Sequence, residues 1–130
     1  MRQFVYISTA AHDVSNDDVA KILESSQRNN PDRGITGFLI FNGRNFLQLV
    51  EGSEEALLSL MNQLARDSRH SGIVRLEDIP IGTRTCEDWA MTRLRLIDPV
   101  NERRADLDAV LPVSLAPSVR RTILNFAALN

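Results

Sequence analysis

The 130-residue sequence lacks most of the features that identify disulfide, metal and membrane proteins. Cys86 is the single cysteine, so an internal disulfide is excluded, and the two histidines, His12 and His70, offer no metal-ligand spacing. No apolar run reaches the roughly 20 residues of a membrane helix, and the N-terminus is too short in apolar length for a secretory signal. We therefore expect a cytoplasmic protein with no metal and no membrane partner.

The chain also has little net charge. Its 15 Lys and Arg against 17 Asp and Glu give a formal charge of -2 and a pI near 5.6. Such a balance provides no basic field that would attract a phosphate backbone, so we expect no nucleic-acid partner. Hydrophobic residues make up 43% and charged residues 25%, which is typical of one ordinary globular domain.

The first third of the chain predicts a strand followed by a helix. Residues 3–9 alternate between two faces, as in a half-buried strand. Ser15 with Asp18 three residues later is typical of a helix N-terminus, and Pro31 disfavours the helical conformation at Asn30. The pattern therefore predicts a helix that ends at Asn30.

The middle of the chain predicts a hairpin, a second helix and two further strands. Residues 35–41 and 46–50 are rich in β-formers, and the Asn-Gly turn in residues 42–45 tolerates a positive φ. A helix follows Ser53, with apolar residues at helical spacing. The remaining predictions are strands at 73–79 and 90–96, with a loop at 81–88 between them.

This β-α-β-β-α-β-β order predicts an α+β, ferredoxin-like sheet with two helices on one face. The opposite face is then open. Two short amphipathic helices, at 101–111 and 117–129, are predicted after Pro99, and we expect them to cover that face or a partner.

Several polar residues fall where a site could form. Tyr6 and Gln48 occupy central strand positions on a face predicted to be buried, where each needs a hydrogen-bond partner. A glutamine satisfied by backbone or by Tyr6 alone would explain this equally. Asn29 and Asn30 have a structural explanation too, as a helix C-cap before Pro31.

Five short stretches of the chain stand out together: residues 4–8 (FVYIS), 26–37 (SQRNNPDRGITG), 46–52 (FLQLVEG), 66–70 (RDSRH) and 89–91 (WAM). Each is a weak motif alone, but their joint order is specific. In that order and spacing they resemble one known family, the BLUF domains, which are blue-light sensors using flavin. The resemblance implies a flavin-binding photosensor domain at 1–98, followed by an extension at 99–130 for output or oligomerisation.

The resemblance implies a non-covalent flavin between the two helices, beside the sheet. FAD is the expected form, although FMN and riboflavin present the same ring. The implied binding residues are Tyr6, Ile22, Asn29, Asn30, Ile35, Gln48, Asp67, Arg69 and His70. An amide supplies both a donor and an acceptor for the polar edge of the ring, so Asn30 is favoured, with Asn29 nearby. Core packing would explain the two isoleucines equally, and a solvated helix end would explain residues 67–70.

The resemblance also implies which residues respond to light. In the family, light drives electron and proton transfer from a tyrosine to the flavin, and a glutamine then rearranges; Tyr6 and Gln48 match these positions. Trp89 and Met91 match residues that the family places beside that glutamine, although core packing also accounts for both. No net chemistry results, so we expect a photoreceptor and not an enzyme.

One departure and two alternatives remain. Many relatives have phenylalanine where this chain has Cys86, so packing beside Trp89 is expected to differ; the stretch is unlike the cysteine motif of adduct-forming flavin sensors. The alternative functions are a small acylphosphatase-like hydrolase, using Arg33 and Asn30 on a phosphate, and a ligand-binding regulatory module. Because no output segment follows Asn130, we expect a separate output protein and a homo-oligomer.

Overall fold

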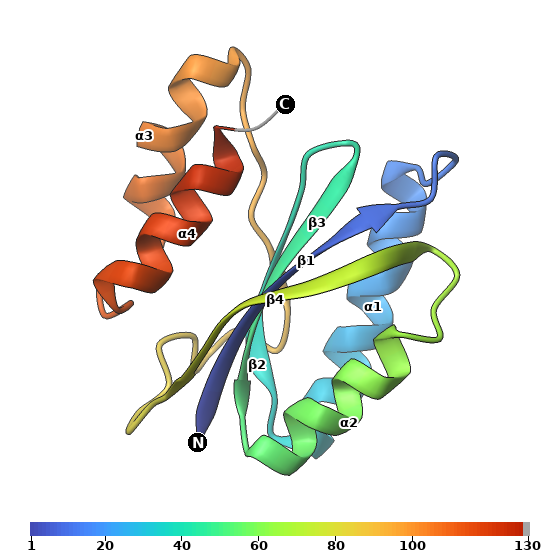
Figure 1. Cartoon of the computed structure of the whole chain (residues 1–130), viewed down its shortest axis with the longest axis vertical. Helices are drawn as coiled ribbons and strands as arrows, with labels where there is room; N and C mark the ends of the chain where they lie inside the picture. Colours follow the sequence, from blue (N-terminus) through green and yellow to red (C-terminus); the bar gives the residue numbers. More distant parts are fainter. Residues whose placement is uncertain (129–130) are drawn as a thin grey trace.

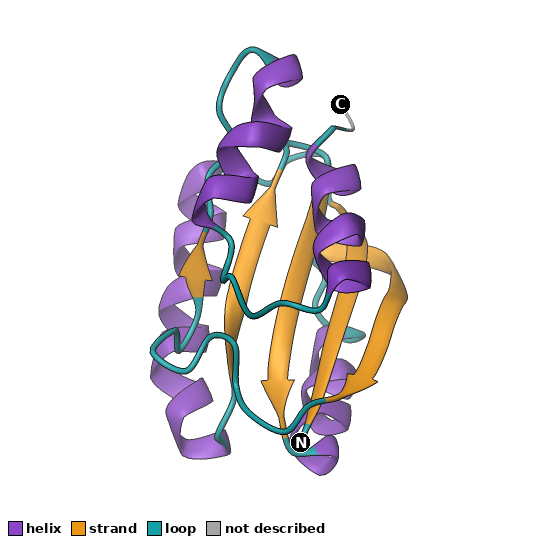
Figure 2. Ribbon diagram, turned by 90° about the vertical axis from the view of Figure 1, so that its left-hand side faces the viewer, coloured by secondary structure: helices purple, strands orange, loops and turns teal. Residues whose placement is uncertain are grey.

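The computed structural model describes residues 1–128 as one mixed sheet with a pair of helices on each face (Figures 1 and 2). The elements are β1 (Arg2–Ala10), α1 (Asn16–Arg33), β2 (Thr36–Phe41), β3 (Asn45–Gly52), α2 (Glu54–Leu64), β4 (His70–Pro80), β5 (Thr92–Arg93), α3 (Val100–Val110) and α4 (Pro117–Ala127). The strand order is β4-β1-β3-β2-β5, with β5 parallel to β2 and the other pairs antiparallel. The predicted ferredoxin-like α+β fold is confirmed. Within residues 1–128, no helix combines the length and apolar character needed to cross a membrane.

Helix α1 begins as predicted but ends later. The Ser15 side chain accepts a hydrogen bond from the Asp18 N–H, and the Asp18 carboxylate accepts one from the Ser15 N–H, which completes the capping box. The helix then continues through Pro31 to Arg33, so the prediction that it ends at Asn30 is wrong. A proline in the last turn removes only one backbone N–H, whereas Gly34 adopts the left-handed conformation (φ 66°) that stops the helix.

Strand β5 is shorter than predicted, because residues 89–91 do not alternate as a strand would. Trp89 packs against the core on one face of the sheet, and Met91 belongs to the core on the other. Residues two apart in a regular strand share a face, so this segment cannot pair regularly. Only Thr92–Arg93 pair with β2, in place of the predicted 90–96, whereas β4 exceeds its predicted range at both ends.

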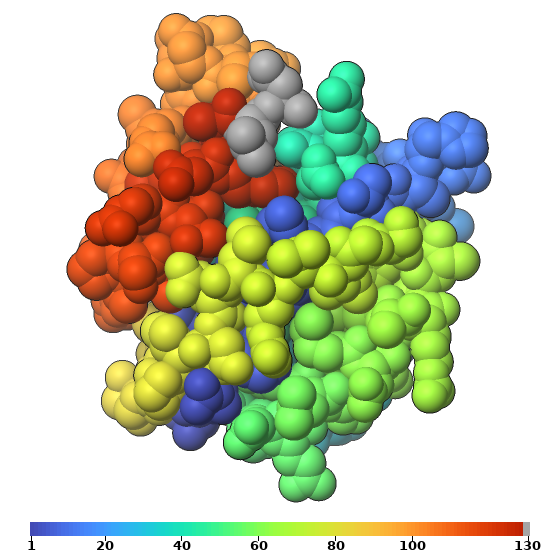
Figure 3. All heavy atoms as spheres, viewed as in Figure 1, coloured from blue at the N-terminus to red at the C-terminus, as the bar shows by residue number. Residues whose placement is uncertain are grey.

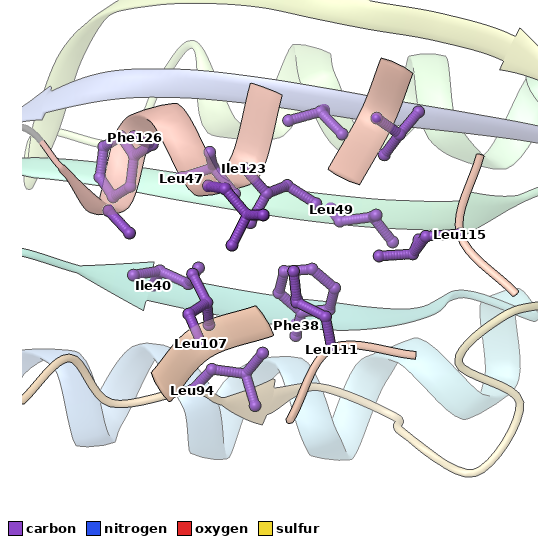
Figure 4. Packing of buried hydrophobic residues seen from close by; sticks show 14 of the residues in the cluster. Phe38, Ile40, Leu47, Leu49, Leu94, Leu107, Leu111, Leu115, Ile123 and Phe126 are labelled. Carbon is purple, nitrogen blue, oxygen red and sulfur yellow. The ribbon is translucent and has the colours of Figure 1, made fainter. Parts of the chain in front are cut away.

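Helices α3 and α4 cover the face of the sheet that α1 and α2 leave free; we call it the tail face, and the opposite side the recess face. Figure 4 shows Leu107 of α3, Leu111 just after that helix and Ile123 of α4 packed on residues of β2 and β3. The cover for the open face is therefore supplied by the chain itself. The predicted helix end at Leu129 lies outside the described residues.

Strand β4 forms one edge of the sheet and is visible across the surface between α4 and α2 in Figure 3. Val74 and Leu76 on this strand are 52% and 41% exposed. The opposite edge is covered by the segment that leads into β5. The central strands β1 and β3 are thus enclosed, and they carry the polar residues described next.

Candidate functional site

The central strands bring the predicted tyrosine and glutamine side by side on the recess face. Tyr6 on β1 lies directly opposite Gln48 on β3, and Leu39 on β2 is the next neighbour of Gln48. Cross-strand partners project to the same side of a sheet, so the three side chains form one row. Tyr6 and Gln48 are 1% and 6% exposed.

This row forms one wall of a recess between the sheet and the two helices α1 and α2. The recess is lined by Tyr6, Ser8, Ile22, Leu39, Phe46, Gln48, Leu64, Asp67 and His70. It adjoins a more polar recess, lined by Ile22, Ser25, Ser26, Asn29, Asn30, Arg33, Leu60, Gln63, Leu64, Asp67 and Arg69. Three residues line both. A mostly apolar recess with a few convergent polar groups is typical of a site for a small ligand.

The two central polar groups have unused hydrogen-bonding capacity. Gln48 Nε2 donates to the Met91 thioether sulfur at 3.4 Å, and a thioether is only a weak acceptor. Burial raises the pKa of Tyr6 well above its ordinary value, and the nearby charge of Asp67 adds to this shift. The phenol therefore keeps its proton. A buried amide and a neutral phenol together offer donors and acceptors to a group in the recess.

Helix α1 ties the segment before β5 to the recess. Asn30 Nδ2 donates to the Ala90 carbonyl at 2.7 Å, and Gln27 Nε2 donates to the Met91 carbonyl at 2.8 Å. Asn30 is 3% exposed and lies within the helix, so the C-cap explanation for its side chain is wrong. Its amide oxygen remains available as an acceptor. Asn29 is exposed and lines the polar recess only.

The residues after α2 close the far side of the recess. His70 Nε2 lies 2.9 Å from the Leu64 carbonyl, which can only accept, so this nitrogen carries a proton; Nδ1 lies 2.8 Å from Ser8 Oγ. Asp67 and Arg69 form an ion pair at 2.6 Å. The side-chain hydrogen bond between them lowers the pKa of Asp67 and raises that of Arg69. These contacts hold the side chains of Asp67, Arg69 and His70 in place at the edge of the recess.

Two of the predicted site residues, Trp89 and Ile35, lie elsewhere. Trp89 packs edge-on against Phe38, with ring centroids 6.0 Å apart, in the core of the tail face, so Met91 alone of that pair contacts Gln48. Ile35 is fully buried in the core beneath α1 and α2 and lines neither recess, whereas Ile22 lines both. Cys86 belongs to the tail-face core as well.

Sequence reasoning missed several residues of the site. Ser8 and Phe46 line the recess two positions from Tyr6 and Gln48 respectively, as strand alternation predicts. Gln27 lies three residues before Asn30, which places both on one side of a helix. These periodicities could have found all three, whereas the polar residues Ser25, Ser26 and Gln63 carried no such signal.

Comparison with known proteins identifies the family that this chain resembles. The model described as "BLUF: Sensors of blue-light using FAD" matches residues 1–92. Photoactivated adenylate cyclase subunit beta of Euglena longa is 32% identical over 88 residues, which cover 67% of this chain and 10% of that protein. The blue light- and temperature-regulated antirepressor BluF of Escherichia coli (strain K12) is 33% identical over 72 residues, covering 55% of this chain and 18% of the antirepressor. This chain therefore spans a fifth or less of these relatives.

Solved structures agree with this result. Klebsiella pneumoniae BlrP1, in a manganese/cy-diGMP complex, has a TM-score of 0.84 at 28% identity, covering 98% of this chain and 32% of that protein. The dark-state structure of BlrB, described as a BLUF protein, has a TM-score of 0.74 at 28% identity and covers 96% of both chains.

The recess fits the group that the family binds. Its apolar end has Tyr6 and the under-used amide of Gln48 at one wall, which suits a flat ring with a polar rim, and its other end is polar. The family match over residues 1–92, together with the likeness of the fold to a BLUF protein, shows that the chain belongs to the BLUF family of blue-light sensors, whose domains bind flavin.

Proposed function

We propose that this protein is a blue-light sensor that holds FAD with the ring in the apolar recess and reports illumination to a separate output protein. The observation that carries the proposal is the buried pair of Tyr6 and Gln48 on one wall of that recess, with Gln48 bonded to a thioether alone. A glutamine packed for stability would have stronger partners, because buried polar groups are normally satisfied.

The ring would be held by the residues around this pair. Ile22 and Phe46 offer apolar surface to its faces, and the amide oxygen of Asn30 offers an acceptor to its N–H. The tail of the flavin would extend into the polar recess, where Arg69 and Arg33 supply positive charge for phosphate groups. Asp67 orients Arg69 there through their ion pair.

The light response would involve one electron and one proton that Tyr6 gives up and then regains. A bound flavin supplies the blue-light absorption and accepts an electron when excited. Tyr6 gives up this electron together with the proton on its phenol oxygen, and takes both back. Gln48 rotates or tautomerises meanwhile, so its donor and acceptor exchange places and the bond to Met91 changes. No covalent product results, and we therefore propose no enzymatic activity for this chain.

The energy available for signalling sets a requirement on the output. A rearranged neutral hydrogen bond is worth about 0.5–1.5 kcal/mol, or up to about a tenfold population shift. The responding element must therefore be nearly balanced in the dark. The segment leading into β5 is the candidate for this element, because Met91 contacts Gln48 while Trp89 packs in the tail-face core beside α3 and α4. We propose that this 99–130 extension passes the signal on.

Illumination tests the proposal directly. Purified protein should be yellow, and blue light should move its flavin absorption slightly to the red, with recovery in darkness. Protein that stays colourless with added FAD would contradict it and would favour the hydrolase or the regulatory module. The hydrolase is less favoured, because Asn30 Nδ2 donates to the Ala90 carbonyl and so is not free to donate to a phosphate.

Assembly needs a separate experiment. We propose a homo-oligomer that changes its association with the output protein in light. Sedimentation of the flavin-loaded protein in darkness and under blue light should give a mass above that of a 14.6 kDa monomer. Monomeric protein in both conditions would contradict the oligomer but not the photochemistry.

A further inference from the structure

Glu51 is a completely buried acidic residue near the end of β3, three positions after Gln48. It pairs across the strands with Gln3 on one side and Thr36 on the other. The odd spacing places it on the tail face, away from the recess. A carboxylate buried without partners is strongly unfavourable, so its surroundings must compensate it.

Five hydrogen bonds reach this carboxylate. The donors are Gln3 Nε2 at 3.3 Å, Thr36 Oγ1 at 3.0 Å, Thr85 N at 3.0 Å, Thr85 Oγ1 at 3.1 Å and Cys86 N at 2.6 Å. Two of them are backbone N–H groups of the segment that follows β4. Glu51 therefore fixes the main chain of that segment to the sheet, and does so regardless of which side chains the segment carries.

Arg84 strengthens the same attachment. Its guanidinium donates to Thr36 Oγ1 at 2.8 Å, to the Glu51 carbonyl at 3.1 Å and to the Gly34 carbonyl at 2.5 Å. Thr36 accepts from Arg84, which leaves its own hydroxyl proton for Glu51. The positive charge thus lies one hydroxyl away from the buried carboxylate, and the segment is also tied to the end of α1.

The attached segment leads directly to the glutamine. We call residues 84–91 the strap. Beyond Cys86, the strap is held at three successive carbonyls: Trp89 accepts from the Gly37 N–H at 2.8 Å, Ala90 from Asn30 and Met91 from Gln27. It ends where the Met91 sulfur accepts from Gln48. One end of the strap is therefore fixed by Glu51 on the tail face, and the other contacts Gln48 on the recess face.

We propose that Glu51, assisted by Arg84, is a positioning residue that sets the contact between the Met91 sulfur and the Gln48 amide by anchoring the strap. This inference rests on the photosensor function proposed above. Glu51 takes no part in the photochemistry, because the sheet separates it from the recess. Its effect reaches Gln48 through the strap, whose backbone has fixed points on both sides of Trp89.

A double-mutant cycle on the rate of dark recovery tests the proposal. Glu51→Gln keeps the shape of the side chain. Its single oxygen can replace only one of the two carboxylate oxygens that accept hydrogen bonds, and its NH₂ group would face N–H or O–H donors at the other position. Met91→Leu removes the sulfur acceptor. We expect Met91→Leu to change the recovery rate in the wild-type protein, and to change it by less than about twofold once Glu51→Gln has released the strap. The same fold-change in both backgrounds would overturn the proposal, as would a Met91→Leu variant that recovers normally.

Controls separate this role from a general loss of stability. Glu77→Gln alters another carboxylate of the sheet, which bonds Thr122 on α4 and does not bond the strap; the full Met91→Leu effect should persist in its presence. Arg84→Gln on the half-exposed end of the strap provides a second background if Glu51→Gln fails to fold, with the same expected loss of the Met91→Leu effect. Hydrogen exchange at Thr85 and Cys86 should rise in both anchor variants, while flavin content stays that of the wild type. Absence of any light response in the wild-type protein would refute the photosensor function itself. That result is distinct from every outcome of the cycle, which compares recovery rates after illumination.

Discussion

The chemistry of the site depends on two side chains whose neighbours differ. Tyr6 and Gln48 share one row of the sheet, but Tyr6 is enclosed so that its phenol stays neutral, whereas Gln48 is left with a weak acceptor. Burial therefore keeps the phenol of Tyr6 protonated. At Gln48, the weak acceptor leaves the amide able to change hydrogen-bond partners.

Replacing Tyr6 by phenylalanine should separate flavin binding from light response. The ring of phenylalanine fills the same volume in the core, so the flavin content of the purified protein should remain near that of the wild type. The phenolic proton is lost, so the red shift under blue light should disappear. Absorption spectra before and after illumination measure both quantities, and a normal shift in this variant would remove Tyr6 from the mechanism.

The thiol of Cys86 should be inert in the folded protein. Burial raises its pKa to about 12, with the Glu51 carboxylate adding to the shift. A raised pKa keeps the thiol neutral, and at pH 8 only about one part in ten thousand is thiolate, the form that reacts. Iodoacetamide should therefore label Cys86 in denaturant but leave the native protein unmodified over the same time, as read by mass spectrometry. Rapid native labelling would indicate an accessible thiolate and reopen the question of a flavin adduct.

At the scale of elements, the ends of helices and strands decide how the recess is shaped. Helix α1 continues past Pro31, which keeps Asn30 inside the helix and directs its amide to the Ala90 carbonyl. Had the helix ended at Asn30, that amide would be free to cap it. Asp67 and Arg69, between α2 and β4, and His70, the first residue of β4, are likewise held in place, by the ion pair and by the contact of His70 with Ser8.

The Asp67–Arg69 pair should make a small, pH-dependent contribution to stability. The pKa of Asp67 is lowered in the folded protein, chiefly by the hydrogen bond from Arg69. The contribution is therefore complete above the ordinary aspartate pKa of about 4, and is lost as the pH falls through the lower folded-state value. Because both side chains are partly exposed, we expect at most about 1 kcal/mol.

Denaturant unfolding of the wild type and of Asp67→Asn between pH 2 and pH 7 measures this contribution. The difference in free energy of unfolding should be constant near neutral pH and should shrink at the acidic end. A difference that grows as the pH falls would have the wrong sign and would contradict the assignment of the pair.

At the scale of the whole molecule, α3 and α4 complete the core on the tail face. Ile123 is fully buried there, among residues of both helices and the central strands, as Figure 4 shows. The sheet therefore has an apolar core on each side, and the recess lies within only one of them. A change in α3 or α4 can reach the recess only through the sheet or the strap.

Truncating Ile123 to alanine should destabilise the whole protein. Loss of a fully buried aliphatic side chain costs about 2–5 kcal/mol, measured as the change in free energy of unfolding. Val113→Ala in the loop between α3 and α4 is the matched control, because this side chain is 96% exposed and its truncation should cost less than about 0.5 kcal/mol. Equal effects of the two substitutions would mean that α4 does not pack on the sheet in solution.

The sequence by itself determined the elements whose cause is local. The Ser15 capping box, the Asn-Gly turn and the alternation of residues 3–9 each act within a few residues, and each predicted its element correctly. The order of those elements determined the ferredoxin-like sheet, and alternation placed Tyr6 and Gln48 on one face. The family motifs in the sequence indicate the flavin sensors without any tertiary information.

Tertiary structure alone decided the points where distant segments meet. The opposite faces taken by Trp89 and Met91 and the attachment of the strap to Glu51 both depend on contacts between residues remote in sequence. No periodicity encodes such contacts, because an irregular segment follows whichever donors the finished sheet presents. In the sequence, Glu51 looks like any other residue of a strand. Only the folded chain brings the N–H groups of Thr85 and Cys86 to its carboxylate.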